Sequence, residues 1–232
     1  MLSSYGGGLL QGDTVELDVD GRVGSRLFLG SQAHAHVYRS PDGRTSTWSL
    51  RATLEDALAV VYLNPLIPHA QSLYRQRQVW RLMGASNLVL VEWFSAGRVK
   101  TGEVFAFESV ETELELHLDS ELLVIERMRI EPGIIACGSP MHFDDYRQWM
   151  NIYLIGHQAK DLAGLFTHEA VRGNDANASL SHICSTHPIK DKGFQVRSIS
   201  REREPLEELL QTLFEKLREV AWLGFNPLRH KQ

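Results

Sequence analysis

The sequence predicts a mainly β fold, with antiparallel strands in a β-helix-like or sandwich-like arrangement and two α-helices late in the chain. Residues 14–19 and 112–118 alternate apolar and charged side chains, which is the period of half-buried strands. Other short apolar runs end at Gly or Pro turns, and helical periodicity is confined to the last third. Since no helical pattern separates successive strands, a βαβ parallel sheet is not expected, and a sandwich, a barrel and a β-solenoid remain open.

Further strands are expected wherever an apolar or alternating run lies between turn-forming residues such as Gly24, Gly84 and Pro132. These runs are 25–32, 34–39, 47–54, 58–63, 72–82, 87–94, 104–110, 122–130 and 148–155. No internal repeat is evident and no linker divides the chain, so we expect a single domain over residues 1–232.

Residues 205–222 predict an amphipathic helix, with Pro205 in the first turn and Gly224 after the end. Its apolar stripe consists of Leu206, Leu209, Leu210, Leu213, Phe214, Leu217, Val220 and Ala221. A weaker helix is expected over 158–171. The polar segment 172–192 is expected to be a loop with one short strand near 179–184.

The composition is that of an ordinary globular protein and excludes several classes of function. The 232 residues include 24 Lys and Arg against 29 Asp and Glu, a net charge of −5, so there is no basic footprint for nucleic acid. No apolar run approaches the ~20 residues that span a membrane. The first residues lack the features of a secretory signal, so we expect a cytoplasmic protein. Cys137 and Cys184 are too few for a disulfide framework.

Two groups of residues are candidate metal ligands. His34 and His36 are two residues apart on an expected strand and would face the same side, where two imidazoles can bind a first-row metal. The sequence names no third ligand, so two solvated histidines are the other interpretation. His182, Cys184 and His187 form a second group that matches no zinc-finger spacing, and a solvated loop is its alternative.

Two glycine-rich segments predict turns. Gly6 to Gly8 and Gly12 precede Asp13 without the Lys-Ser/Thr of a phosphate-binding loop, so we expect a turn with positive φ in which Asp13 accepts hydrogen bonds from nearby amides. In the segment 96–107, Arg98 and Glu103 are expected to pair across a turn. That pair is either turn chemistry or a fixed polar lining for a passage or a docking site.

Nothing in the sequence matches a known catalytic pattern. No G-x-S-x-G motif is present, and Cys137 lies in an apolar run that disfavours a reactive thiolate. A metal-dependent hydrolase that uses His34, His36 and an acidic partner is a distant option.

Several segments together resemble the D-type urease accessory proteins, the UreD family, which is called H in some organisms. They are GGGLLQGD (6–13), SQAHAHVYRS (31–40), NPLIPHAQSLYRQRQ (64–78), AGRVKTGEVFAF (96–107), LLVIERMRIEP (122–132) and the last helix with LGFNP. Their order and spacing match over nearly the whole chain. The family commonly has a lysine where this chain has His36.

The resemblance implies a non-catalytic scaffold for nickel delivery during urease maturation. It implies partners in the F-type and G-type accessory proteins and apo-urease, with no tightly bound cofactor and nickel only in transit. The residues it singles out for partner or ion-path contacts are Asp13, Gln32, Tyr38, Arg39, Arg98 and Glu103, with His34 and His36 as metal candidates. The alternative is a β-rich interaction module or nickel store that has lost its coupling to urease.

Overall fold

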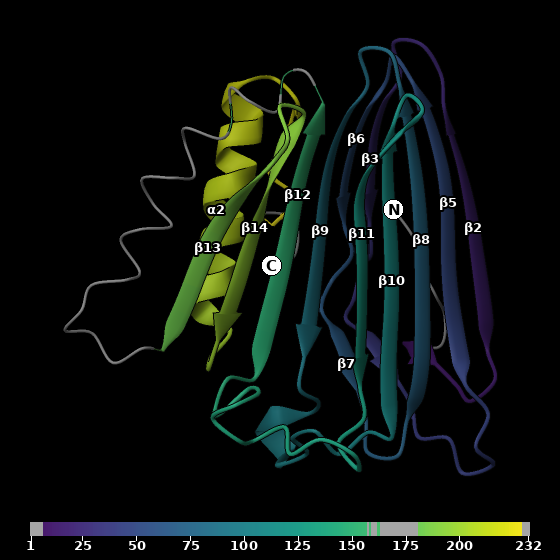
Figure 1. Ribbon diagram of the computed structural model, residues 1–232, viewed down its shortest axis with the longest axis vertical. Helices are drawn as coiled ribbons and strands as arrows, with labels where there is room; N and C mark the ends of the chain where they lie inside the picture. Colours follow the sequence, from purple (N-terminus) through teal and green to yellow (C-terminus); the bar gives the residue numbers. More distant parts are fainter. Residues whose placement is uncertain (1–6, 157, 159–161, 163–180, 229–232) are drawn as a thin grey trace.

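The computed structural model describes residues 7–156, 158, 162 and 181–228. Within these residues, a nine-stranded first sheet faces a five-stranded second sheet (Figure 1). The helix α2, Glu204–Glu219, packs on the outer face of the first sheet, so the chain forms three layers there. The prediction of a mainly β fold is confirmed.

Strands of the two sheets alternate along the first half of the chain. The first sheet contains β1 (Gly8–Leu9), β3 (Arg26–Gly30), β4 (Ala35–Val37), β6 (Leu58–Tyr62), β7 (Leu66–Pro68), β9 (Asn87–Ser95), β12 (Gln148–Gly156), β13 (His182–Ile189) and β14 (Gly193–Ser200). The second sheet contains β2 (Thr14–Gly21), β5 (Ser46–Glu55), β8 (Leu73–Met83), β10 (Ser109–Leu118) and β11 (Glu121–Ile130). A short 3₁₀ helix, η1, spans Val99–Thr101.

The expectation of purely antiparallel sheets is wrong. β2, β5, β8 and β10 are parallel neighbours, and so are β3, β6 and β9, because the chain crosses to the other sheet and returns in the same direction after each coil. This is a solenoid-like arrangement. Antiparallel pairs occur between β10 and β11 and among β9, β12, β14 and β13. An alternating sequence pattern indicates which face of the sheet each side chain occupies, but it does not indicate whether the neighbouring strand is parallel or antiparallel.

The coils differ in length, which explains why no repeat is evident in the sequence. Thr14 is paired with Thr47, Thr47 with Arg75, and Arg75 with Glu111, so the sequence offset changes at every step.

Several stretches were assigned wrongly from the sequence. Residues 104–108 form bends rather than a strand, and β10 begins only at Ser109. The short strand expected near 179–184 is present in part, as the longer β13, and the strands β1, β7 and β14 were missed. In β14 the buried positions include Ser198 and Ser200, so burial does not produce an apolar alternation there.

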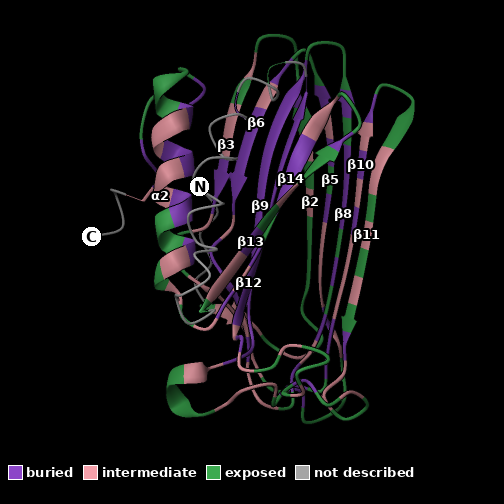
Figure 2. Cartoon of the chain, turned by 60° about the vertical axis from the view of Figure 1, so that its left-hand side comes forward, coloured by how far each residue is buried: buried purple, intermediate pink, exposed green. Residues whose placement is uncertain are grey.

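The strand β9 is buried on both faces (Figure 2), and this burial explains why its sequence is almost continuously apolar. Val89 and Val91 belong to the cluster with α2, whereas Leu88 and Leu90 belong to the cluster between the sheets. The next position on the inner face is Glu92, a carboxyl group within the protein interior.

The late helix is confirmed, but it ends earlier in the sequence than expected. Leu206, Leu209, Leu210, Leu213, Phe214 and Leu217 are buried against the first sheet. Val220 and Ala221 are not part of this stripe, because the helix ends at Glu219 and Ala221 has a φ of 57°. The second helix, expected over 158–171, falls outside the described residues except for 158 and 162. The described part of the chain has no helix with the length and apolar character needed to cross a membrane.

Candidate functional site

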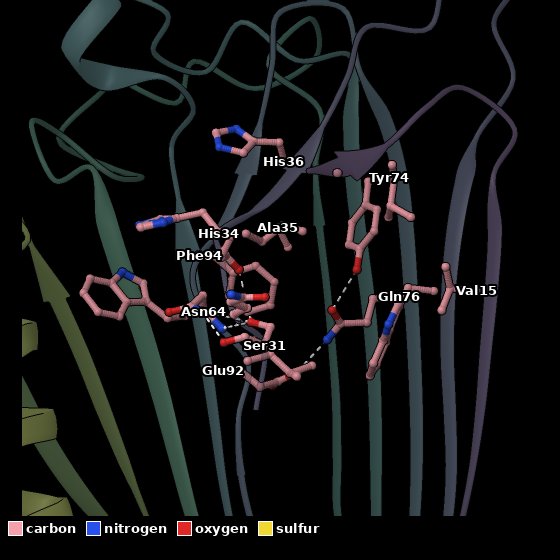
Figure 3. Close-up of a pocket in the computed structure, with 18 of the residues that line it drawn as sticks. Val15, Ser31, His34, Ala35, His36, Asn64, Tyr74, Gln76, Glu92 and Phe94 are labelled. Carbon is pink, nitrogen blue, oxygen red and sulfur yellow. Dashed lines mark hydrogen bonds between the residues drawn. The ribbon is translucent and has the colours of Figure 1, made fainter. Parts of the chain in front are cut away.

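A cavity of about 430 Å³ opens between the two sheets, near the segment that links β3 to β4 (Figure 3). Its walls come from β8 and β9 in the interior and from the N-terminal segments at its mouth. Four of the residues predicted from the sequence line it: Asp13, Gln32, His34 and His36.

Glu92 lies in the cavity wall within a chain of polar side chains. Its Oε1 accepts hydrogen bonds from Gln76 Nε2 at 2.8 Å and from Gln78 Nε2 at 2.7 Å (Figure 3 shows the former). The chain continues on both sides, because Tyr74 donates to Gln76 Oε1 at 3.0 Å and Trp80 donates to Gln78 Oε1 at 3.2 Å. These four donors are alternate residues of β8 and therefore share its inner face.

Burial between the sheets raises the pKa of Glu92 to about 8, and the nearby carboxylate of Glu126 contributes in the same direction. Hydrogen bonds from Gln78 and Gln76 oppose the shift and do not cancel it. At neutral pH the site therefore holds a carboxyl group that is largely protonated.

Glu126 extends the polar interior toward the surface. It accepts hydrogen bonds from Tyr153 at 2.5 Å and Gln195 at 3.0 Å, and it pairs with Arg197 at 3.1 Å. These contacts join β11 of the second sheet to β12 and β14 of the first. Glu126 also lies close enough to Glu92 for its charge to raise the pKa of the latter.

His34 and His36 lie on the same side of the chain, as the sequence predicts, with ring centroids 6.4 Å apart. They contact different partners, however. Arg203 Nη1 lies 2.9 Å from His34 Nε2, and the same guanidinium lies over the ring of Trp93. His36 Nδ1 lies 3.0 Å from Nε2 of His69, a residue that the sequence analysis did not single out.

The predicted pair of Arg98 and Glu103 is present and half-buried. Arg98 Nε donates to Glu103 Oε2 at 2.8 Å, Nη2 contacts the other carboxylate oxygen, and Ala70 N donates to Oε2 at 3.1 Å. The hydrogen bond from Arg98 holds the pKa of Glu103 below its usual value. The pair lies next to His69, so it borders the histidines rather than the cavity wall.

Asp13 has the turn role that the sequence predicts. Its Oδ2 accepts from Leu10 N at 2.8 Å, and Gly12 in that turn has a φ of 76°. Gln32 is exposed at the cavity, and Arg39 is exposed outside it. Tyr38 packs edge-on against His69, with ring centroids 4.8 Å apart.

The second histidine group does not converge. His182 and Cys184 lie on β13 rather than in a loop, and they are turned toward β14, where His182 Nε2 lies 2.5 Å from Ser198 Oγ. His187 is at an odd offset from them, is exposed and contacts Ser185. Burial raises the pKa of the Cys184 thiol.

Comparisons with known proteins decide the family of this chain. The model of the UreD urease accessory proteins matches residues 1–231. A urease accessory protein UreD of Cytophaga hutchinsonii is 31% identical over 98% of this chain and 83% of its own length. The urease accessory protein UreD of Acetivibrio thermocellus is 25% identical, over 92% and 79%, and the urease accessory protein D of Arabidopsis thaliana is 29% identical, over 68% and 54%.

The chain belongs to the UreD family. The resemblance seen in the sequence is confirmed, and the chain is a urease accessory protein that acts in urease maturation rather than as a catalyst. The hydrolase option is therefore wrong. Among the described residues, no group of three or more His, Cys, Asp or Glu side chains is placed to hold a metal ion.

Sequence reasoning missed four polar residues of this UreD-family chain: Gln76, Gln78, Glu92 and His69. A signal for three of them is present in the sequence. Glu92 is the one charged residue in the expected strand 87–94, and Gln76 and Gln78 are alternate residues of another strand. The contact of His69 with His36 has no such signal, because it depends on the pairing of β4 with β7.

Proposed function

We propose that this chain is a non-catalytic scaffold that delivers nickel to apo-urease in the cytosol, in a complex with the F-type and G-type accessory proteins. Nickel is the cargo and passes through in transit. Membership of the UreD family supports this role, since the family acts in urease maturation.

The observation that carries the proposal is Glu92 in the wall of the cavity between the sheets. The Glu92 carboxyl group is held by two amide donors and is largely protonated at neutral pH, so it must release its proton when a divalent cation binds. That competition with the proton makes the contact weak and exchangeable. His36 and Gln32 at the same cavity add nitrogen and oxygen atoms of moderate affinity. Weak contacts suit a delivery protein, because the ion must leave again.

The experiment that tests this is urease activation with Glu92→Gln. The variant is co-expressed with the urease subunits and the F-type and G-type proteins, and the nickel content and activity of the purified urease are measured. We expect both to fall by at least about threefold at an equal amount of folded accessory protein. Glu131→Gln is the matched control, because it makes the same chemical change outside the cavity, where Glu131 pairs with Arg129.

Two results would contradict the proposal. One is full nickel loading of urease by Glu92→Gln. The other is a chain that binds nickel and yet leaves urease activity unchanged in the co-expression, which would favour the nickel store. Co-purification with a tagged F-type protein tests the partner separately, and a chain that stays monomeric in its presence would contradict the complex.

A further inference from the structure

The rings of His36 and His69 form a pair whose nitrogen atoms face each other. His36 Nδ1 and His69 Nε2 are 3.0 Å apart, and the ring planes are nearly perpendicular at 84°. A hydrogen bond accounts for that distance when one nitrogen is protonated. The same distance also separates adjacent nitrogen ligands of one metal ion in an octahedral or square-planar shell, since atoms bound at about 2.1 Å with an angle near 90° are about 3 Å apart.

The backbone holds this pair in place from both sides. β4 and β7 are parallel neighbours with His36 opposite Ile67, so His69, two residues further, is the diagonal neighbour of His36 on the same face. His69 N donates to Val37 O at 2.9 Å. Tyr38 packs edge-on against the His69 ring and limits its rotation. Both imidazole rings are therefore largely ordered before a ligand binds.

The surroundings favour neutral imidazoles, which are the form that binds metals. Partial burial lowers the pKa of both histidines, and the positive charge of Arg98 adds to this effect. That same charge would repel a cation, but Glu103 pairs with Arg98 and offsets it. Glu103 also places a carboxylate beside His69.

We propose that His36 and His69 together bind one first-row divalent cation of the kind that imidazole favours, such as Ni²⁺ or Zn²⁺, with water completing the coordination shell. Before binding, one of the two facing nitrogens carries a hydrogen. When the ion binds, this nitrogen releases a proton to solvent and the outer nitrogen of the same ring takes one up. Both histidines therefore bind as neutral ligands without net proton release. This assigns His69, and not His34, as the partner of His36, because Arg203 occupies Nε2 of His34. It concerns binding by the isolated chain and does not depend on nickel delivery to urease.

Equilibrium dialysis of the full chain tests the proposal, with NiCl₂ and with ZnCl₂ as separate probes at neutral pH. The variants are His36→Ala, His69→Phe and the double variant, with His34→Ala and His187→Ala as controls. Phenylalanine keeps a flat ring against Tyr38, so His69→Phe removes the ligand with little loss of packing.

We expect the parent and both controls to bind one equivalent of metal ion. Each variant of His36 or His69 should bind this ion at least tenfold more weakly. The double variant should lose no more than either single variant, because both histidines serve one ion. Parent-like binding by His69→Phe, or loss of the equivalent in His34→Ala, would overturn the assignment.

A second measurement covers the case in which the variants fold poorly. Cu²⁺ bound to the parent should show nitrogen hyperfine structure from two imidazoles in its electron paramagnetic resonance spectrum. A spectrum with oxygen ligands only would overturn the proposal whatever the variants do.

Discussion

Glu92 Oε1 lies 2.7 Å from Gln78 Nε2, and this hydrogen bond joins the inner faces of the two sheets. This hydrogen bond holds the Glu92 carboxyl group in the interior, where burial favours its neutral form. The described interior therefore places, next to an apolar core, a carboxyl group whose charge state depends on pH.

The first prediction concerns the pH dependence of stability. An unfolded Glu92 ionises near pH 4.5, whereas the folded one has a pKa of about 8, so between these values folding takes up a proton. The free energy of unfolding then falls as pH rises, by at most about 1.4 kcal/mol per pH unit. Glu92→Gln cannot ionise and can accept the same two hydrogen bonds.

We expect the thermal midpoint of Glu92→Gln to match the parent near pH 4.5 and to exceed it increasingly up to pH 8. Scanning calorimetry at several pH values measures this, with Glu131→Gln as control. A difference between variant and parent that stays constant with pH would show that Glu92 is ionised in the fold.

The second prediction tests the packing of α2. Leu213 is fully buried against the first sheet, so Leu213→Asp should lower the free energy of unfolding by about 4 kcal/mol through burial of an unpaired charge. Val220→Asp is the control, because Val220 is 41% exposed just after the helix, and it should cost less than about 1 kcal/mol. Denaturant titration compares them, and equal losses would mean that α2 is peripheral to stability.

The third prediction concerns Gly8 in β1. A Cβ atom at this position would lie 2.4 Å from the carbonyl oxygen of His36, so Gly8→Ala must push β1 away from β4. We expect a clearly lower thermal midpoint. Gly133→Ala is the control, since a Cβ atom there meets nothing within 4 Å. Equal midpoints for both variants would show that β1 does not stay paired in solution.

The fourth prediction separates turn chemistry from function at Asp13 and Glu103. Each accepts hydrogen bonds from backbone amides, so Asp13→Ala and Glu103→Ala should each cost about 1 kcal/mol of stability. We expect urease activation in co-expression to fall further than that loss explains. The two quantities are measured side by side in the same variants. If activation falls only in proportion to the loss of folded protein, both residues merely stabilise turns.

Features whose partners lie close together in the sequence were predictable, and features that join distant residues were not. The turn at Gly12 and Asp13 and the pair of Arg98 and Glu103 were predictable, because their partners are a few residues apart. The binding role of the predicted residues stays a prediction. His36 and His69 are 33 positions apart, and His34 and Arg203 are 169 positions apart. No local sequence pattern predicts contacts over such separations.

By itself the sequence determined the family, the mainly β character and the amphipathic helix, because these depend on residue order and on periods of two and 3.6 residues. Tertiary structure alone decided the parallel pairing within each sheet, the short end of α2 and the grouping of Glu92 with Gln76 and Gln78. The reason is physical: a strand's period fixes which face its side chains occupy, whereas its neighbours depend on how the whole chain winds between the two sheets.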